Sequence, residues 1–188
     1  LRAGTAGLTI NNPITLTTSG IIDTNSTTFS LSGNIGGGSG LTVQGGSTAV
    51  FSGTNTYGGV TTITTTTLRL DAPGSLPALG NVTNNGSLVF NYGGSGSYSG
   101  SVSGSGLVTV QGGGTVTLAG TNSYAGGTNI DVGQLTVTGS IVGDVTVNTA
   151  GTFDVQNSFT MNDLVGAAGS NAIIVGGNTL TFGSSNST

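Results

Sequence analysis

The chain contains no cysteine, histidine, tryptophan, lysine or glutamate among its 188 residues. The lack of cysteine excludes disulfide bonds and cysteine-based zinc sites. Without histidine there is no Ser-His-Asp triad, and without cysteine or lysine two common covalent nucleophiles are missing. We therefore expect that the chain is not an enzyme, that it has no catalytic residues and that it binds no cofactor.

Charge is also scarce, since charged residues make up 4% of the chain and the net charge is −4. The isoelectric point is near 4.1, whereas nucleic acids and anionic membranes bind cationic surfaces. No stretch reaches the roughly 18 apolar residues that a transmembrane helix needs. We expect no nucleic-acid partner and no membrane insertion by this segment. The charged residues are Arg2, Arg69, Asp23, Asp71, Asp131, Asp144, Asp154 and Asp163.

The aspartates are the remaining candidates for chemistry. Two carboxylates could serve a polysaccharide-cleaving enzyme if coils brought Asp131 near Asp144 or Asp154. Arg69 then stands almost alone to bind an anionic sugar. Asp23-Thr24-Asn25 lacks the spacing of a calcium loop, and the Gly-Gly-x-Gly-x-Asp repeat of calcium-binding β-rolls is absent. We therefore predict solvated turn aspartates and no metal site.

Glycine and short β-branched runs dominate what is present. The chain has 37 glycines and a mean hydropathy of +0.23, which is too apolar for a disordered chain. Runs of four or five residues read as strands separated by glycine or asparagine turns. The only helix-like composition, near 164–168, is too short to predict a helix. Examples of the predicted strands are Leu107–Gln111, Thr115–Ala119, Gln134–Thr138, Val145–Asn148, Thr152–Val155, Ala172–Val175 and Thr179–Phe182.

A long internal repeat organises these runs. Val43-Gln44-Gly45-Gly46 returns as Val110-Gln111-Gly112-Gly113, 67 positions later, with one- or two-residue slips outside the best-matched part. The repeat covers about 30–90 and 97–155. At the same offset the matching residues are Gly53, Asn55, Tyr57, Gly59 and Thr61 in the first copy, and Gly120, Asn122, Tyr124, Gly126 and Thr128 in the second.

A repeat of this kind predicts an all-β, single-stranded parallel β-helix, with about three short strands per coil of roughly 20 residues. The offset then corresponds to about three coils. Like side chains stack along such a rod, so Thr, Ser and Asn suit its surface whereas stacked charges would repel. We expect Asn55 and Asn122 to bond a neighbouring coil and Tyr57 and Tyr124 to pack beside the core. A binding role for the tyrosines is the alternative.

The segments Gly53-Thr-Asn-Thr-Tyr57-Gly-Gly-Val-Thr61 and Gly120-Thr-Asn-Ser-Tyr124-Ala-Gly-Gly-Thr128 resemble the autotransporter-associated β-strand repeat of bacterial passenger domains. The resemblance covers about residues 27–156. The second copy continues with Val132-Gly133-Gln134-Leu135, as in that family, whereas the first departs at Thr65-Thr66-Thr67-Leu68. The resemblance implies a right-handed β-helix that is secreted or displayed on the bacterial cell surface.

The expected function is therefore structural, with 1–188 forming one β-helix segment of a longer solenoid. It would act as an extracellular rod in adhesion, cell–cell association or scaffolding. Its expected partner is a further copy of itself, associated end to end or laterally, or a cell-surface or polysaccharide ligand. The alternative is a filament subunit that stacks end to end. A polysaccharide-binding or polysaccharide-cleaving β-helix remains a further rival. So does ice binding by Thr-x-Thr pairs, which occur at Thr15–Thr17, Thr62–Thr64, Thr115–Thr117, Thr136–Thr138 and Thr179–Thr181.

Overall fold

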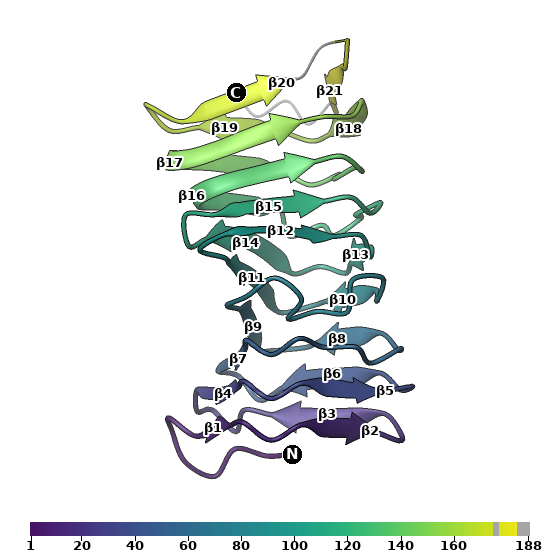
Figure 1. Cartoon of the computed structure of the whole chain (residues 1–188). Coiled ribbons are helices and arrows are strands. Elements are labelled where there is room, and N and C mark those ends of the chain that lie inside the picture. The colour runs from purple at the N-terminus through teal and green to yellow at the C-terminus, as the bar shows by residue number, and fades with distance from the viewer. Residues whose placement is uncertain (175–176, 184–188) are drawn as a thin grey trace.

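The computed structural model shows a parallel β-solenoid of about eight turns, and it describes residues 1–174 and 177–183 (Figure 1). Each turn takes about 20 residues, every paired strand runs parallel to its neighbour, and the described residues form no helix. The predicted fold class is confirmed. The coils rise in chain order from the N-terminal end to the C-terminal end, so segments about 20 residues apart lie side by side.

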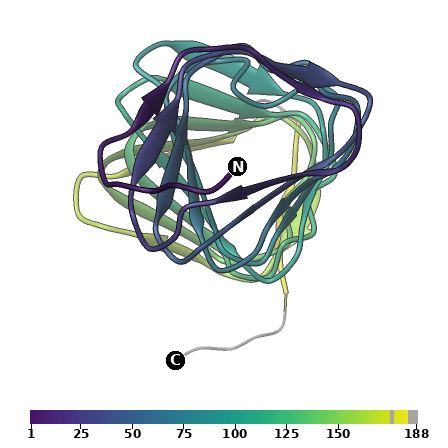
Figure 2. The ribbon, with the colours of Figure 1, turned by 90° about the horizontal axis from the view of Figure 1, so that it is seen from below.

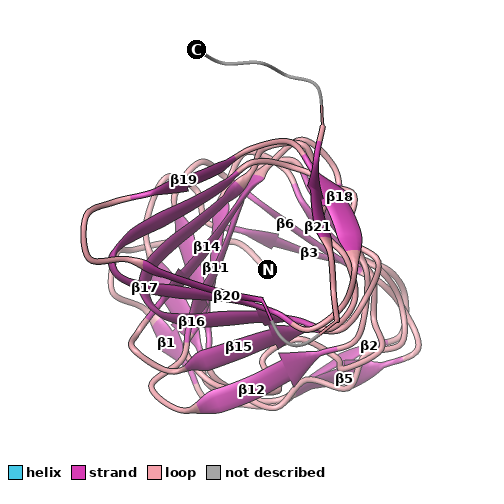
Figure 3. Cartoon of the chain, turned by 90° about the horizontal axis from the view of Figure 1, so that it is seen from above, coloured by secondary structure: helices cyan, strands magenta, loops and turns pink. Residues whose placement is uncertain are grey.

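Three strand-bearing faces make up each coil, and the view along the axis shows them as the sides of a rounded triangle (Figures 2 and 3). Face 1 contains β1 (Thr9–Ile10), β4 (Phe29–Leu31), β7 (Thr48–Phe51), β9 (Thr67–Leu70), β11 (Ser87–Asn91), β14 (Leu107–Gln111), the first parts of β16 (Thr128–Val137) and β17 (Val145–Val155), and β19 (Leu164–Gly166). Face 2 contains β2 (Ile14–Leu16), β5 (Ile35–Gly37), β12 (Ser95–Tyr98), β15 (Thr115–Leu118), the second parts of β16 and β17, and β20 (Asn171–Ile174). Face 3 contains β3 (Gly20–Asp23), β6 (Leu41–Gln44), β8 (Thr61–Ile63), β10 (Val82–Asn84), β13 (Val102–Ser103), β18 (Phe159–Met161) and β21 (Leu180–Phe182).

The core is a continuous stack of apolar side chains between the faces. Alternate residues of each short strand point inward, as the period of two in a β-strand requires. One such column is almost completely buried and carries one side chain from each successive coil. Its members are Leu31, Phe51, Leu70, Phe90, Val110, Ile130 and Val147. Burial of each contributes about 1.5–3 kcal/mol against exposure, so the stack stabilises the whole length of the rod.

Glycine columns allow the coils to meet closely at the corners. A Cβ on Gly100 would lie 2.0 Å from the carbonyl oxygen of Gly80, and a Cβ on Gly120 would lie 2.3 Å from that of Gly100. The next coil repeats this at Gly139, whose Cβ would lie 2.1 Å from the Gly120 oxygen. A side chain cannot fit at these separations, which explains part of the glycine content.

Some predicted strand boundaries differ from the observed ones. The predicted strand Gln134–Thr138 is the second part of β16, and the predicted strands Val145–Asn148 and Thr152–Val155 are joined in β17. The chain bends around the corner within each strand, helped in β16 by Gly133 at φ 97°. The region with helix-like composition forms strand β19 instead. Val175, predicted to end a strand, lies outside the described residues.

Candidate functional site

The first copy of the repeated motif occupies face 2 between β7 and β8, where a bonded side chain replaces part of a strand. Asn55 Oδ1 accepts a hydrogen bond from the backbone N–H of Ile35 at 2.7 Å. Asn55 Nδ2 donates to the backbone oxygen of Ser75 at 2.7 Å. Ile35 lies one coil before Asn55 and Ser75 one coil after it, so one buried amide joins three successive coils.

The second copy repeats this arrangement between β15 and β16. Asn122 Oδ1 accepts the backbone N–H of Val102 at 2.9 Å, and Asn122 Nδ2 donates to the backbone oxygens of Ser140 at 3.0 Å and Gly120 at 2.8 Å. Both asparagine side chains are buried, so the backbone groups they bond have no access to water as an alternative partner. We call Asn55 and Asn122, with these bonds, the asparagine clamps.

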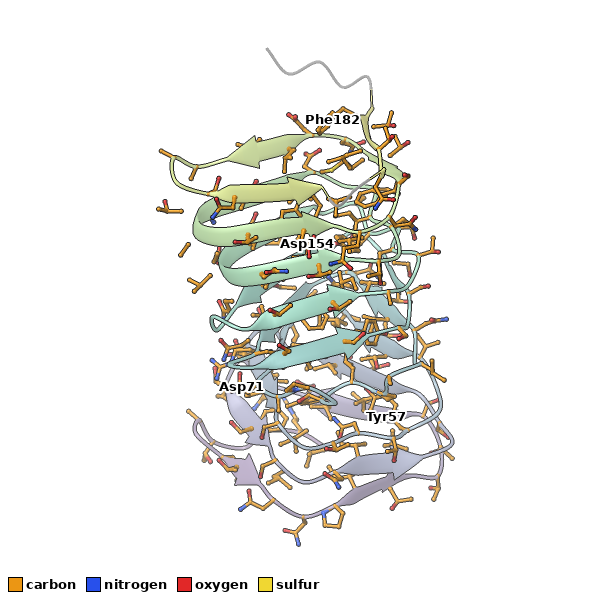
Figure 4. The ribbon with its side chains drawn as sticks, turned by 45° about the horizontal axis from the view of Figure 1, so that its top comes forward. Tyr57, Asp71, Asp154 and Phe182 are labelled. Carbon is orange, nitrogen blue, oxygen red and sulfur yellow. The ribbon has the colours of Figure 1, made fainter. Side chains whose placement is uncertain are left out.

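Each clamp is followed by the same buried tyrosine–threonine pair. The hydroxyl of Tyr57 lies 2.6 Å from Thr61 Oγ1, and that of Tyr124 lies 2.6 Å from Thr128 Oγ1. Both rings are 1% exposed and form part of the core, as Figure 4 illustrates for Tyr57. Burial raises the pKa of both tyrosines to about 12, so both hydroxyls stay neutral at physiological pH. The rings present no face on which a ligand could stack.

The motif glycines lie where neighbouring coils approach most closely. A Cβ on Gly53 would lie 2.5 Å from the oxygen of Gly33, and a Cβ on Gly59 would lie 2.3 Å from the backbone nitrogen of Gly40. In the second copy, Gly120 meets the preceding coil in the same way. A Cβ on Gly126 would lie 2.4 Å from the carbonyl carbon of Gly106. The ten motif residues thus form two local units of the same design.

The two units lie on different faces. Thr61 stands in a face 3 column with Leu41, Val82 and Val102. Thr128 stands in a face 1 column with Val108 and Val145. The 67-residue offset is therefore three coils plus one face, which makes the expected value of about three coils more exact. The second copy is turned by about one third of a circle relative to the first.

The Thr-x-Thr pairs are distributed over several faces. Thr117 and Thr136 stand in register on face 2, but Thr62 lies on face 3 and Thr15 lies on β2 at the N-terminal end of face 2. Different polar residues occupy successive coils at these positions of face 2. Gln134 pairs in register with Thr115 of the preceding coil, and Asp154 pairs with Thr136. No continuous face of threonine pairs exists in the described coils.

The aspartates have separate surroundings. Asp131 Oδ1 accepts a bond from Asn148 Nδ2 at 2.6 Å, whereas Asp144 is exposed at a corner. Asp163 takes the position one coil beyond Asp144, because the next residues, Val145 and Leu164, pair in register. The Asp163 carboxylate accepts a bond from the backbone N–H of Leu164 at 2.9 Å. Among residues 1–174 and 177–183, no group of three or more His, Cys, Asp or Glu side chains could hold a metal ion.

Asp154 is enclosed by amides and a hydroxyl on face 2. Its Oδ2 accepts bonds from Gln156 Nε2 at 2.8 Å, Gln134 Nε2 at 3.1 Å and Thr136 Oγ1 at 3.3 Å. Its Oδ1 is buried without a hydrogen-bond partner. Figure 4 shows Asp154 among the upper coils, far along the rod from Tyr57. These contacts fix the side chain, but they do not form a catalytic pair with a second carboxylate.

Two aspartates have lowered pKa values. At Asp23 the main cause is a hydrogen bond from the Asn25 backbone N–H to its carboxylate, at 2.8 Å. At Asp71, burial opposes ionisation, but bonds from Arg69 and Asn91 outweigh it and lower the pKa. Arg69 and Asp71 form a bidentate ion pair on the outer surface of the rod. Both sites are local surface contacts.

A second set of asparagines also links coils and was not predicted from the sequence. Asn34 Oδ1 accepts the N–H of Thr54 at 3.0 Å, and Asn85 Oδ1 accepts the N–H of Ser105 at 3.1 Å. Asn81 bonds Ser101 in the same way. Each pair is separated by 20 positions, so an Asn with Ser or Thr at that spacing is a signal that could have identified them.

The fold and the clamps define the chain as a parallel β-solenoid whose successive coils are joined through buried side chains. No family model, no curated protein and no solved structure matches it. The described residues also contain no helix that is long and apolar enough to cross a membrane.

Proposed function

We propose that the chain is a stiff structural rod, part of a secreted or cell-surface bacterial protein of the autotransporter passenger type. In this role it holds material at a distance from the cell, in adhesion, cell–cell association or scaffolding. The observation that carries the proposal is the pair of asparagine clamps. Each replaces strand pairing by a buried side chain that bonds both neighbouring coils.

Resistance to bending and opening follows from these contacts. Separating two coils at a clamp would break hydrogen bonds that each contribute about 0.5–1.5 kcal/mol to stability. The clamps add to backbone ladders and to an apolar core that continues through every coil. Such a rod keeps its shape without disulfides, cofactors or ion-pair networks.

The extracellular setting is supported by the motif resemblance and by composition. The resemblance lies in the clamp residues, which are the residues that the rod needs for joining its coils. The chain has no cysteine, so its stability does not depend on the redox state outside a cell. It has only two arginines and no lysine, so its stability depends little on the salt concentration.

Antibodies against the purified chain test the proposal in the cells that produce it. Labelling of intact cells, removed by external protease, is expected. Beads coated with the chain should aggregate with each other or bind surface polysaccharide, and both partners are tested in parallel. Labelling that requires permeabilised cells would overturn the extracellular role, and a flexible or globular shape in solution scattering would overturn the rod.

End-to-end assembly is a second candidate, favoured by apolar side chains at both ends of the stack. A cavity of about 110 Å³ opens at the N-terminal end between Leu1, Ile14 and Ile21, and Phe182 is half-exposed at the other end (Figure 4). The described end strands are parallel, so one copy could extend the ladders of another by strand addition. Electron microscopy of the purified chain should then show filaments of constant width, whereas single short particles at high concentration contradict this candidate.

A further inference from the structure

One loop departs from the repeat. Strand-paired positions Thr61 and Val82 in the first copy correspond to Thr128 and Val145 in the second. From Leu70 the chain takes twelve positions to reach Val82, but from the equivalent Val137 only eight to reach Val145. The loop 71–81, which covers face 2, is therefore four residues longer than its repeat equivalent on face 3, and we call it the inserted loop.

The inserted loop holds an exposed leucine in a fixed position. Leu79 is 83% exposed, more than any other large apolar side chain of the described residues. Its neighbour Gly80 donates its N–H to the oxygen of Pro77 at 3.0 Å and accepts a bond from the Tyr98 hydroxyl. Ser75, earlier in the loop, is held by the Asn55 clamp. The exposure of Leu79 therefore belongs to an anchored conformation.

An open groove lies beside Leu79. It has a volume of about 460 Å³ and lies between the motif residues 54–58 of one coil and the inserted loop of the next. Leu76 and Pro77 are among its apolar lining residues, and no charged residue lines it. Leu79 is itself one of the residues that line the groove. Val60, on the coil below at the same corner, is also nearly half exposed.

We propose that this surface docks a second copy of the chain, with Leu79 of each copy seated in the groove of the other. An exposed side chain and an open groove lie on one patch, so two copies related by a twofold axis would make the same contact twice. The groove is uncharged, and thus two chains of net charge −4 can meet there without placing like charges together. The contact joins rods side by side and is independent of their ends, of their localisation and of the proposed rod function.

The absence of cysteine permits a direct test. A chain carrying Leu79→Cys is mixed under mild oxidation with a differently tagged chain carrying Thr56→Cys, which places the second thiol at the groove. The control pairs Leu79→Cys with Ser123→Cys, the repeat equivalent of Thr56 on another face. We expect a mixed disulfide-linked dimer with Thr56→Cys at least about tenfold more abundant than with the control, as for a contact made only in the docked pair.

Sedimentation of the unmodified chain provides the second readout. Because one leucine per groove makes a small interface, we expect weak dimers that appear only toward about 1 mM chain. Leu79→Asp should abolish them, and Val142→Asp, at an exposed valine outside the patch, should leave them unchanged. Equal cross-linking to both partners overturns the proposal. So does a chain that remains monomeric throughout, or a dimer that survives Leu79→Asp.

Discussion

Thr61 and Thr128 are equivalent in the repeat, and each bonds the hydroxyl of the tyrosine four residues before it, yet they lie on different faces of the solenoid. The repeat therefore advances by three coils and a third of a turn. As a result the asparagine clamps hold the rod on two sides. A rod clamped on more than one side resists bending in more than one direction, which suits the proposed structural role.

The clamps predict a large difference between buried and exposed asparagines. Asn55→Ala leaves the Ile35 N–H and the Ser75 oxygen without partners in the interior and should reduce the free energy of unfolding by about 2–4 kcal/mol. Asn122→Ala should have a similar effect. Asn85→Ala is the control, because its bond to Ser105 is exposed and water can replace it, at a cost below about 1 kcal/mol. Urea denaturation measures all three, and equal losses would contradict the clamp interpretation.

The corner glycines predict a steric effect. Gly53→Ala and Gly120→Ala place a methyl group 2.5 Å and 2.3 Å from backbone oxygens of the preceding coil. We expect each to destabilise the chain by about 2–3 kcal/mol, because backbone must move to admit the methyl group. Gly58→Ala, in the same motif, would meet its nearest atom at 3.5 Å and should cost less than about 1 kcal/mol. Thermal unfolding compares them, and similar melting temperatures for Gly53→Ala and Gly58→Ala would be inconsistent with the observed coil separation.

The tyrosine–threonine pairs predict coupling between the two hydroxyls. Thr61→Val should cost about 1–3 kcal/mol, because it leaves the buried Tyr57 hydroxyl without its partner. Adding Tyr57→Phe removes that hydroxyl, so the double variant should be destabilised by less than the sum of the two single variants. A double-mutant cycle should give a coupling energy above about 0.5 kcal/mol. Tyr124 and Thr128 provide the replicate, and additive losses at both pairs would argue against the bond.

Alkaline pH should unfold the rod. Burial raises the pKa of Tyr57 and Tyr124 from 10.0 to about 12, and it raises those of Tyr92 and Tyr98 as well. Between pH 10 and 12 the folded chain therefore holds protons that the unfolded chain releases, and stability falls as pH rises. This contribution is complete below pH 10 and is lost through pH 12.

Tyrosinate absorbance and circular dichroism should change together in that pH window as the chain unfolds. Replacing both motif tyrosines by Phe removes two of the titrating groups and should make stability less dependent on pH there. Ionisation of all four tyrosines near pH 10, with the β-sheet signal intact, would show that the rings are not buried.

The fold was predictable because each level of the sequence agreed with it. Short β-branched runs predicted the strands, and the motif that recurs at a fixed offset predicted the repeat. The near absence of charge was consistent with similar coils stacked on one another. The clamp role of Asn55 was also expected in kind, since an interior amide in a solenoid turn has only backbone groups of adjacent coils to bond. The number of hydrogen bonds that Asn55 makes was not predictable. The sequence does not show that one side-chain amide bonds both Ile35 in the preceding coil and Ser75 in the following coil.

The rotation between repeats could not be read from the offset alone. Dividing 67 by a coil of about 20 residues leaves a remainder, and loops of variable length can absorb it. The register of Thr61 with Val82 and of Thr128 with Val145 settles the question, and it depends on pairing between coils. The exposure of Leu79 was not predictable for a related reason. A leucine in the short apolar run 76–79 is expected in the core, and only the structure shows that the loop 71–81 leaves its side chain exposed.

Native-state hydrogen exchange at two clamped amides tests the central claim that the coils behave as one stiff rod. The N–H groups of Ile35 and Val102 are bonded by Asn55 and Asn122 and lie three coils and one face apart. If the coils behave as one rod, both amides exchange only through global unfolding, at equal free energies that match the free energy of unfolding from denaturation. We also expect that Asn55→Ala accelerates exchange at Ile35 far more than at Val102. Fast exchange at either amide in the unmodified chain, by opening of separate coils, would contradict it.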